Sequence, residues 1–347
     1  MLGRDGTRLQ QVTLSGPEVT KMVQGVSLTE IGILLYPGCA MASVHGLTDA
    51  FEVANQYAAQ HGGPVRIRTT HWRLADNGFE RGFDTAPGVD GQPDYVVVPG
   101  RLADPLTAPD VADFVPWLRE RHDRGATIAS ICGGAFMLGH AGLLDGRRAT
   151  THWLYANHFQ AMFPAVAMTP SDIVVEDGDI ITAGGMLAWT DLGLRLIHRV
   201  LGPTVMSEAA KFLLVDPSGR EQRNYSTFAP RLNHGDTAVL KVQHWLQAHS
   251  GQEINIGELA ARAGLEQRTF LRRFHKATGL RPTEYVQALR IGLARERLEF
   301  SRDSVERIAF NVGYKDPSAF RRVFQKVTGL SASAYRERFS AARAAGT

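Results

Sequence analysis

One stretch of the 347-residue chain occurs twice, and this internal repeat constrains the fold more than any other feature of the sequence. The first copy, ELAARAGLEQRTFLRRFHKATGL, begins at Glu258, and the second, RIAFNVGYKDPSAFRRVFQKVTGL, begins at Arg307. The second copy has one extra residue in its turn, so corresponding positions lie 49 residues apart before the turn and 50 after it. Each copy has the pattern of a short helix, a turn that contains glycine and a longer helix ending in Thr-Gly. This is the layout of a helix-turn-helix unit.

The longer helix of each copy has an apolar side and a polar side. The apolar stripes, which we expect to pack into a core, are Phe270, Leu271 and Phe274 in the first copy and Phe320, Val323 and Phe324 in the second. The outward candidates are Arg268, Thr269, Arg272 and Lys276 in the first copy and Ser318, Arg321, Arg322 and Gln325 in the second. A recognition helix needs this arrangement, because its cationic and amide side chains must reach phosphates and guanine edges. The alternative for a single copy is a helical hairpin with solvated arginines.

Charge is distributed unevenly along the chain. Residues 236–347 contain 19 Lys and Arg against 11 Asp and Glu, a formal charge of +8, whereas the remaining residues contain 19 against 24, a formal charge of −5. The net charge of +3 hides this asymmetry. Together with the repeated helices, the basic surplus indicates a polyanionic partner, double-stranded DNA.

Residues 238–339 resemble the DNA-binding domain of the AraC/XylS family of bacterial regulators. The resemblance includes the Gly-Tyr-x-Asp-x-Ser-x-Phe stretch at residues 313–320. It implies two recognition helices, joined by the long helix Thr283–Glu299, that enter successive major-groove segments of an operator roughly 34 Å apart. Asp316 and Pro317 supply an N-cap and a first-turn proline, which fix the start of the second recognition helix. The helices of this domain are expected at residues 238–250, 256–263, 267–278, 283–299, 305–312, 317–328 and 332–339.

The N-terminal part alternates short β-branched runs with helical patterns, which indicates a parallel sheet covered by helices. The strand candidates are residues 31–36, 65–70, 95–98, 127–131 and 180–183, and the helix candidates are 44–60, 110–124, 134–141, 153–163 and 187–201. Residues 172–183 carry a hairpin signal at Asp177-Gly178. We therefore expect an α/β domain at residues 28–214, a linker at 215–237 and an all-helical domain at 238–339.

A cysteine stands at a predicted strand-to-helix turn of the α/β domain. Cys132 follows the apolar strand 127–131 and precedes Gly133 and Gly134, as in the nucleophile turns of α/β enzymes. A helix N-terminus beyond it would stabilise a thiolate, and His152 is a candidate base or orienting partner. The alternatives are a small buried apolar residue for Cys132 and a helix-capping role for His152.

The segment Ser130–Trp153 resembles the PfpI/ThiJ-like, class I glutamine-amidotransferase-like fold, and more closely its variant fused to an AraC-type domain, the GlxA-type transcriptional regulators. The resemblance implies a flavodoxin-like parallel sheet sandwich and a homodimer formed through it. Enzymatic members place a glutamate just after the first strand, but residues 37–48 contain no acidic residue. We therefore expect Cys132 and His152 to line a pocket and not to perform turnover.

Ligands of open parallel sheets bind at the carboxyl ends of the strands. The pocket is accordingly expected at Gly38, Cys39, Gly100, Cys132, Gly133, His152 and Gly184. The family resemblance implies that its effector is a small amine or an amino-acid derivative.

Several other classes of protein are excluded by the sequence. It contains no run of about 18 apolar residues, and its first 27 residues lack the apolar region of a secretory signal, so we expect a cytoplasmic protein without a membrane segment. Its histidines lack the spacing of zinc ligands, and Gly184-Gly185 is not followed by the Lys of a phosphate loop. We expect no metal and no cofactor.

The leading hypothesis is a transcription regulator whose α/β domain binds a small metabolite and whose tandem helix-turn-helix domain binds an operator. One alternative is a cysteine-dependent hydrolase or amidase that carries a DNA-binding appendage. A further alternative is a DNA-binding module whose α/β half only dimerises.

Overall fold

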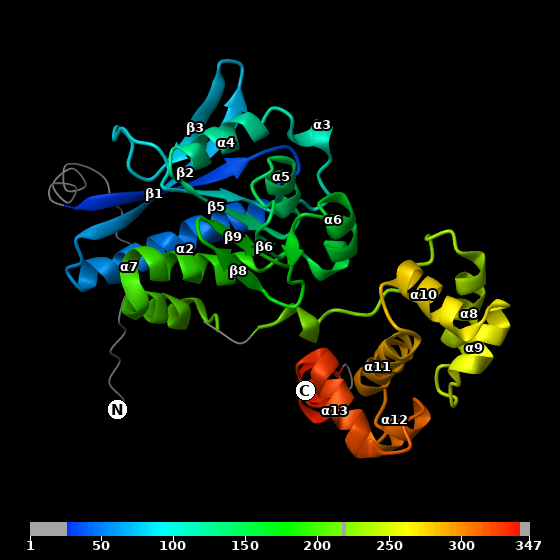
Figure 1. Ribbon diagram of the computed structural model, residues 1–347. Helices are drawn as coiled ribbons and strands as arrows, with labels where there is room; N and C mark the ends of the chain where they lie inside the picture. Colours follow the sequence, from blue (N-terminus) through cyan, green and yellow to red (C-terminus); the bar gives the residue numbers. More distant parts are fainter. Residues whose placement is uncertain (1–25, 217–219, 341–347) are drawn as a thin grey trace, which may run out of the picture. The chain divides into compact units, whose positions relative to one another are not determined.

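The computed structural model describes residues 26–216 and 220–340, which divide into two compact units with the boundary after residue 219 (Figure 1). The first unit is an α/β sandwich, and the second is built of helices. Among the described residues, no helix combines the length and apolar character that crossing a bilayer requires.

The α/β unit is organised around one seven-stranded sheet. Its strands are β1 (Ser27–Leu35), β2 (Val65–Ala75), β3 (Gly78–Asp84), β4 (Tyr95–Val98), β5 (Thr127–Ile131), β8 (Val174–Asp177) and β9 (Ile180–Ala183). They lie in the order β3-β2-β1-β4-β5-β9-β8, in which the five central strands are parallel and β3 and β8 pair antiparallel at the edges. The parallel strands have the flavodoxin-like order, so the expected fold class is confirmed. The hairpin predicted at residues 172–183 is present as β8 and β9.

Helices cover both faces of this sheet (Figure 1). They are α2 (Met41–Gln60), α3 (Ala108–Val111), α4 (Val115–Asp123), α5 (Ala135–His140), α6 (Ala156–Met162) and α7 (Trp189–Leu213), and a small second sheet joins β6 (Arg148–Ala149) to β7 (Ala167–Met168). The adjacent residues Ile33 and Leu34 of β1 belong to two different buried cores. The first core includes residues of α2 and α7, and the second includes residues of α4, α5 and α6. This alternation is expected of a strand that is buried on both sides.

One helix of the α/β unit extends beyond its predicted end. The sequence pattern places its end at residue 201, but α7 continues to Leu213. Gly202 has a φ of 87° and Pro203 begins the second half, so the predicted end is a kink between two helical segments.

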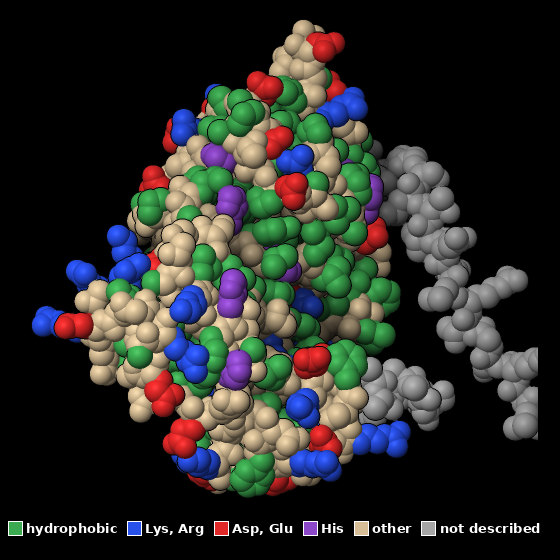
Figure 2. Space-filling view, turned by 90° about the vertical axis from the view of Figure 1, so that its right-hand side faces the viewer, with side chains coloured by type: hydrophobic (Ala, Val, Ile, Leu, Met, Phe, Trp, Pro, Cys, Tyr) green, Lys and Arg blue, Asp and Glu red, His purple; other side chains and the backbone are tan. Residues whose placement is uncertain are grey.

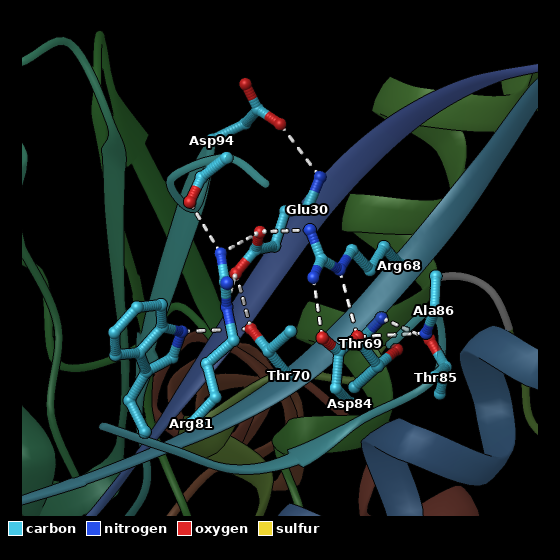
Figure 3. Close-up of polar contacts among 11 residues, drawn as sticks. Glu30, Arg68, Thr69, Thr70, Arg81, Asp84, Thr85, Ala86 and Asp94 are labelled. Carbon is cyan, nitrogen blue, oxygen red and sulfur yellow. Dashed lines mark hydrogen bonds and ion pairs between the residues drawn. The ribbon is translucent and has the colours of Figure 1, made fainter. Parts of the chain in front are cut away.

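The edge strand β3 is absent from the predicted elements, because its sequence GFERGFD lacks an alternating apolar face. A network of buried ion pairs attaches it to the sheet (Figure 3). The carboxylate of Glu30 on β1 accepts hydrogen bonds from Arg68 on β2 at 3.2 Å and from Arg81 on β3 at 3.1 Å. Arg68 also donates to Asp84 at 2.9 Å. Glu30 and Arg68, the two most buried members, each have two partners of opposite charge in this network.

The helical unit contains α8 (Thr237–His249), α9 (Ile256–Ala263), α10 (Gln267–Thr278), α11 (Pro282–Phe300), α12 (Val305–Asn311), α13 (Pro317–Thr328) and α14 (Ala332–Phe339). These bounds agree with the predicted helices to within one residue at each end, because both repeats carry strong start and stop residues. Gly279 and Gly329 adopt left-handed conformations after α10 and α13. Asn255 and Ser304 cap the first helices of the two repeats through their side chains.

Each repeat has its own hydrophobic core. The first core contains Phe270, Phe274 and Tyr285, and the second contains Phe320 and Phe324 among others. Helix α11 contributes residues to both cores. Leu289 packs against the first core and Ile291 belongs to the second.

Part of the segment predicted as a linker, 215–237, packs within the helical unit. The short helix η3 (Gln222–Asn224) is buried at both ends. Arg295 of α11, 3% exposed, donates a hydrogen bond of 2.8 Å to the carbonyl oxygen of Arg223 and a second to that of Ser226. This part of the predicted linker supplies the acceptors that a buried guanidinium requires.

Candidate functional site

The second helix of each repeat buries its aromatic side. Phe270 and Phe274 of α10 are fully buried, as are Phe320 and Phe324 of α13. Leu271, in contrast, is 37% exposed, so its assignment to the core is wrong. At 100° per residue, Leu271 lies about 80° from the centre of the stripe formed by Phe270 and Phe274 and reaches only its edge.

The outward candidates occupy the opposite sides of these helices. Arg268, Arg272, Lys276, Ser318, Arg321 and Arg322 are exposed, and Thr269 is half-buried. Arg268, Arg272 and Lys276 follow one another at intervals of four, so they share one face of α10. Lys326, which corresponds to Lys276 at a separation of 50 residues, is exposed on α13 and was missed. The repeat offset was the signal that could have identified it.

Ion pairs distinguish the arginines of the two helices. Arg321 pairs with Glu306 of α12. Arg273 donates two hydrogen bonds to Asp236, at 2.8 and 2.7 Å, so it braces α10 against the start of α8. At the N-terminus of α13, Asp316 accepts hydrogen bonds from the backbone N–H groups of Ser318 and Ala319, which lower its pKa. The cap predicted at the start of α13 is confirmed.

Figure 2 shows Lys and Arg side chains (blue) mixed with Asp and Glu side chains (red) over one face of the molecule. The charge visible from this side is not gathered in a single patch. This face therefore does not by itself locate a DNA interface, and the assignment rests on the positions along α10 and α13.

Cys132 occupies a strained turn between β5 and α5. Its φ is 52°, a left-handed conformation that a non-glycine residue seldom adopts, and its side chain is 1% exposed. A Cβ on Gly134 would lie 2.5 and 2.6 Å from the carbonyl oxygens of Pro99 and Val98, so this turn needs glycine there. The Thr151 hydroxyl donates to the Cys132 carbonyl oxygen at 2.7 Å. The strand-turn-helix arrangement predicted for Cys132 is therefore present.

The two residues considered as a nucleophile and its base do not form a pair. Burial raises the pKa of the Cys132 thiol to about 11, so the thiol is protonated near neutral pH. The ring Nδ1 of His152 accepts a hydrogen bond of 3.1 Å from the backbone N–H of Leu154 and caps η2 (Trp153–Tyr155), and burial lowers the pKa of His152. Within the described residues, no hydrogen bond joins His152 to Cys132.

A pocket of about 570 Å³ opens where the strand order reverses, between the carboxyl ends of β1 and β4. Parallel sheets of this type bind ligands at such a point. Its lining residues are Leu35, Tyr36, Pro37, Cys39, Met41, Arg73, Leu74, Arg101, Leu106, Asp110, Asp113 and Phe114.

The structure brings most of the predicted pocket residues together at this edge of the sheet. Cys39 lines the pocket itself and forms a β-bridge with Arg101. A Cβ on Gly38 would lie 3.6 Å from Nε of Arg101, and one on Gly133 would lie 3.9 Å from its backbone nitrogen. A Cβ on Gly100 would lie 3.2 Å from Cβ of Cys132, so Cys132 is just behind this wall.

Two predicted residues are placed differently. Gly184 donates its N–H to the carbonyl oxygen of Ile173, which ties it to the β8–β9 hairpin, and it does not line the pocket. His152 also lies outside the lining, although its neighbour Thr151 contacts Cys132.

Arg101 is the functional candidate that sequence reasoning missed. Its Nη1 lies 3.2 Å from Oδ2 of Asp110, while its Nε is buried without a hydrogen-bond partner. Nearby, the Tyr36 hydroxyl donates to the carbonyl oxygen of Pro99 at 2.7 Å, and burial raises the pKa of Tyr36. The available signal was position, because Arg101 follows the strand across the switch point from β1.

An α/β domain followed by two helix-turn-helix repeats defines a DNA-binding transcription regulator of two domains. Residues 259–338 match the family model described as a helix-turn-helix domain, and residues 68–199 match that of the DJ-1/PfpI family. The HTH-type transcriptional regulator CdhR of Pseudomonas aeruginosa is 30% identical over 84% of this chain and 87% of its own length. The chain belongs to the family of regulators that join a DJ-1/PfpI domain to an AraC-type helix-turn-helix domain, and the resemblance seen in the sequence is confirmed.

Two further relatives bear on the function. The HTH-type transcriptional regulator GlxA of Rhizobium meliloti is 26% identical over 90% of this chain and 97% of its own length. The isonitrile hydratase of Pseudomonas putida is 37% identical, but over only 31% of this chain and 46% of its own length.

Proposed function

We propose that this regulator senses a small carboxylate-bearing metabolite in the pocket between β1 and β4. The main observation behind this proposal concerns Arg101. Its side chain lines the pocket, and its Nε is buried without a hydrogen-bond partner. A buried donor without an acceptor costs free energy, and a ligand carboxylate would remove that cost through a charge-assisted hydrogen bond.

The charges around the pocket suit a zwitterionic ligand. Arg101, and Arg73 beside its partner Glu80, can donate hydrogen bonds to a carboxylate, while Asp110 and Asp113 offer negative charge to an ammonium group. An amino-acid derivative carries both groups, in agreement with the effector class implied by the family resemblance. In this proposal Cys132 and His152 support the pocket from behind and perform no turnover.

The output of the sensor is operator binding by α10 and α13 in the bacterial cytoplasm. A ligand that binds one arrangement of the protein more tightly shifts the population toward it, and the affinity for DNA changes in proportion. We propose a homodimer formed through the α/β domain. Ligand binding in the pocket would then affect DNA binding by two helical domains.

The proposal is tested by calorimetric titration of the full chain with amino acids, N-methylated amino acids and simple amines of similar size. We expect binding to require a carboxylate and to fail in Arg101→Met. The matched control is Arg124→Met, since Arg124 is exposed directly after α4 and pairs with Glu120 away from the pocket. Equal binding of amines that lack a carboxylate would contradict the role of Arg101. If no compound binds, the α/β domain is better explained as a dimerisation module.

A cysteine-dependent hydrolase or amidase is the second candidate. The left-handed turn at Cys132 and the partial similarity to isonitrile hydratase favour it. This candidate predicts turnover that is lost in Cys132→Ser and a thiol alkylated rapidly at neutral pH. The regulator proposal predicts that Cys132→Ser retains operator binding, and that alkylation becomes fast only near the raised pKa of about 11.

A further inference from the structure

The two helix-turn-helix repeats have separate cores, so something else must fix the distance between their recognition helices. Helix α11 runs through both cores, which meet between Leu289 and Ile291. Gly292 follows directly, and a Cβ there would meet no atom within 4 Å. Packing does not require glycine at this position, and a glycine inside a helix lowers its stability by about 1 kcal/mol relative to alanine. The connecting helix is therefore weakest where the cores separate.

Arg290 lies at this boundary and bridges the repeats. Its Nε donates to the carbonyl oxygen of Ser250 at 2.7 Å, and its Nη2 donates to that of Gln252 at 2.8 Å. Ser250 follows directly after α8, which packs into the core of the first repeat, and the carbonyls and dipole at the end of this helix favour a cation. On the other side, the guanidinium lies 5.5 Å from the ring centroid of Tyr314, in the turn of the second repeat.

The backbones of the repeats also touch beside this arginine. A Cβ on Gly313, whose φ is 93°, would lie 2.4 Å from the carbonyl oxygen of Gly251. Only glycine permits this approach between the turn of the second repeat and the loop that follows α8. A groove of about 620 Å³ lies alongside, lined in part by these same residues, so the contact between the repeats is narrow.

A fourth contact crosses the same junction. Lys315 and Glu253 form an ion pair at 3.0 Å, but both are more than 80% exposed. Such a pair contributes little in water. The fixed part of the junction is therefore Arg290 with its two carbonyl acceptors and the glycine contact.

We propose that Arg290 is a positioning residue that locks the two repeats together and thereby sets the spacing of the DNA segments that α10 and α13 reach. With the lock removed, α11 bends at Gly292 and the distance between the recognition helices varies. The inference rests on α10 and α13 being the DNA-contacting helices, but the lock itself can be tested without DNA.

The test uses nitroxide labels at His275→Cys on α10 and Val327→Cys on α13 of the full chain, two exposed positions outside the proposed DNA contacts. Cys39 and Cys132 are buried, which disfavours their labelling. Pulsed electron–electron double resonance measures the distribution of distances between the two labels. We expect one narrow distribution for the parent chain and a broadened one for Arg290→Met, which retains the aliphatic stem and loses the donors.

Two further variants make the result specific. Arg297→Met removes an arginine of the same helix whose contact with Asp303, at 3.9 Å, lies within the second repeat, and we expect it to leave the distribution narrow. Adding Gly292→Ala to Arg290→Met should narrow the distribution again, because the helix is stiffened. Circular dichroism verifies that every variant is folded. An unchanged width in folded Arg290→Met, or equal broadening by Arg297→Met, would overturn the proposal.

DNA binding provides the functional readout. An operator selected from random duplexes by the parent protein is compared with versions that carry one or two inserted base pairs between the segments contacted by the repeats. We expect Arg290→Met to bind the original operator less tightly and to lose less affinity on insertion than the parent does. A uniform loss on all three duplexes would contradict the lock. Failure of the recognition-helix assignment would appear differently. Arg272→Ala and Arg322→Ala would then bind DNA like the parent protein, even if Arg290→Met broadens the distance distribution between the labels.

Discussion

The two repeats of the helical unit can be compared position by position, because their second helices lie 50 residues apart in the sequence. The ring centroids of Phe274 and Tyr285 are 5.3 Å apart at an interplanar angle of 85°, and those of Phe324 and Tyr335 are 5.5 Å apart at 84°. The hydroxyl of Thr278 closes the end of α10 by donating to the carbonyl oxygen of Phe274. That of Thr328 does the same for α13.

The surfaces of the repeats are not alike. In α10 the arginine next to Arg272 is held by Asp236, whereas in α13 the arginine next to Arg322 is held by Glu306. The start of α13 is capped by the side chain of Asp316, whereas Glu266 at the start of α10 makes no capping hydrogen bond. A duplicated scaffold with two different outer faces is suited to two different DNA segments, and hence to an asymmetric operator.

The strongest test of the shared scaffold is truncation of its aromatic core. We expect Phe274→Ala and Phe324→Ala each to lower the free energy of unfolding of their own repeat by about 3–5 kcal/mol, because both rings are fully buried. Urea unfolding measures the effect. Leu271→Ala is the control and should cost far less, since Leu271 is 37% exposed. A loss below about 1 kcal/mol for either phenylalanine would show that the cores are not equivalent.

The next test concerns the outer faces. We expect Arg272→Ala and Arg322→Ala to weaken operator binding by about 1–3 kcal/mol if the side chain contacts a base. Titrations at several salt concentrations separate base contacts from phosphate contacts. Loss of a phosphate contact changes the dependence of affinity on salt concentration, whereas loss of a base contact largely leaves it unchanged. Arg302→Ala, exposed before α12, is the control. If both recognition-helix variants keep the parent affinity and salt slope, the assignment of α10 and α13 is wrong.

The capping difference should be visible in stability. Asp316→Ala should lower the melting temperature of the helical unit by a few degrees, because the backbone N–H groups of Ser318 and Ala319 lose their acceptor. The lowered pKa means that this contribution is present above the unfolded-state pKa and is lost as the pH falls through the folded value. Glu266→Ala should have no comparable effect. Circular dichroism measures the melting temperatures. Equal decreases for Asp316→Ala and Glu266→Ala would show that α10 and α13 do not differ in the stability that their caps contribute.

The smallest effect is expected at Arg321. Its pairing with Glu306 occupies the guanidinium, so Arg321→Ala should reduce operator affinity less than Arg322→Ala and leave the melting temperature almost unchanged. Binding titration and thermal melting measure both quantities. A loss as large as that of Arg322→Ala would indicate that the ion pair opens on DNA.

The helical unit was the part most accessible from sequence. Helices α9, α10 and α13 are amphipathic and end at glycines that adopt left-handed conformations, so local pattern and tertiary structure agree there. The error at Leu271 arose because a residue at the edge of an apolar stripe can face either way.

The α/β unit was predicted less completely. β3 was missed because buried ion pairs hold it and no apolar alternation marks it. The turn at Cys132 was predicted from its glycines, but partnership with His152 depends on the direction of a side chain, which local sequence does not encode. Arg101 was missed for a related reason, because its importance comes from the reversal of strand order beside it.

The ion-pair network of Glu30, Arg68, Arg81 and Asp84 also has a consequence for local opening. Two carboxylates and two guanidinium groups cancel in charge, and each lies in contact with at least one opposite charge from another strand. If β3 leaves, Glu30 and Arg68 still pair with each other, but each loses its second partner, and Arg81 and Asp84 lose their ion pairs. We therefore expect the amide protons of the edge strand β3 to be protected from exchange with solvent, and we expect that protection to fall when Arg81 and Asp84 are replaced by neutral residues.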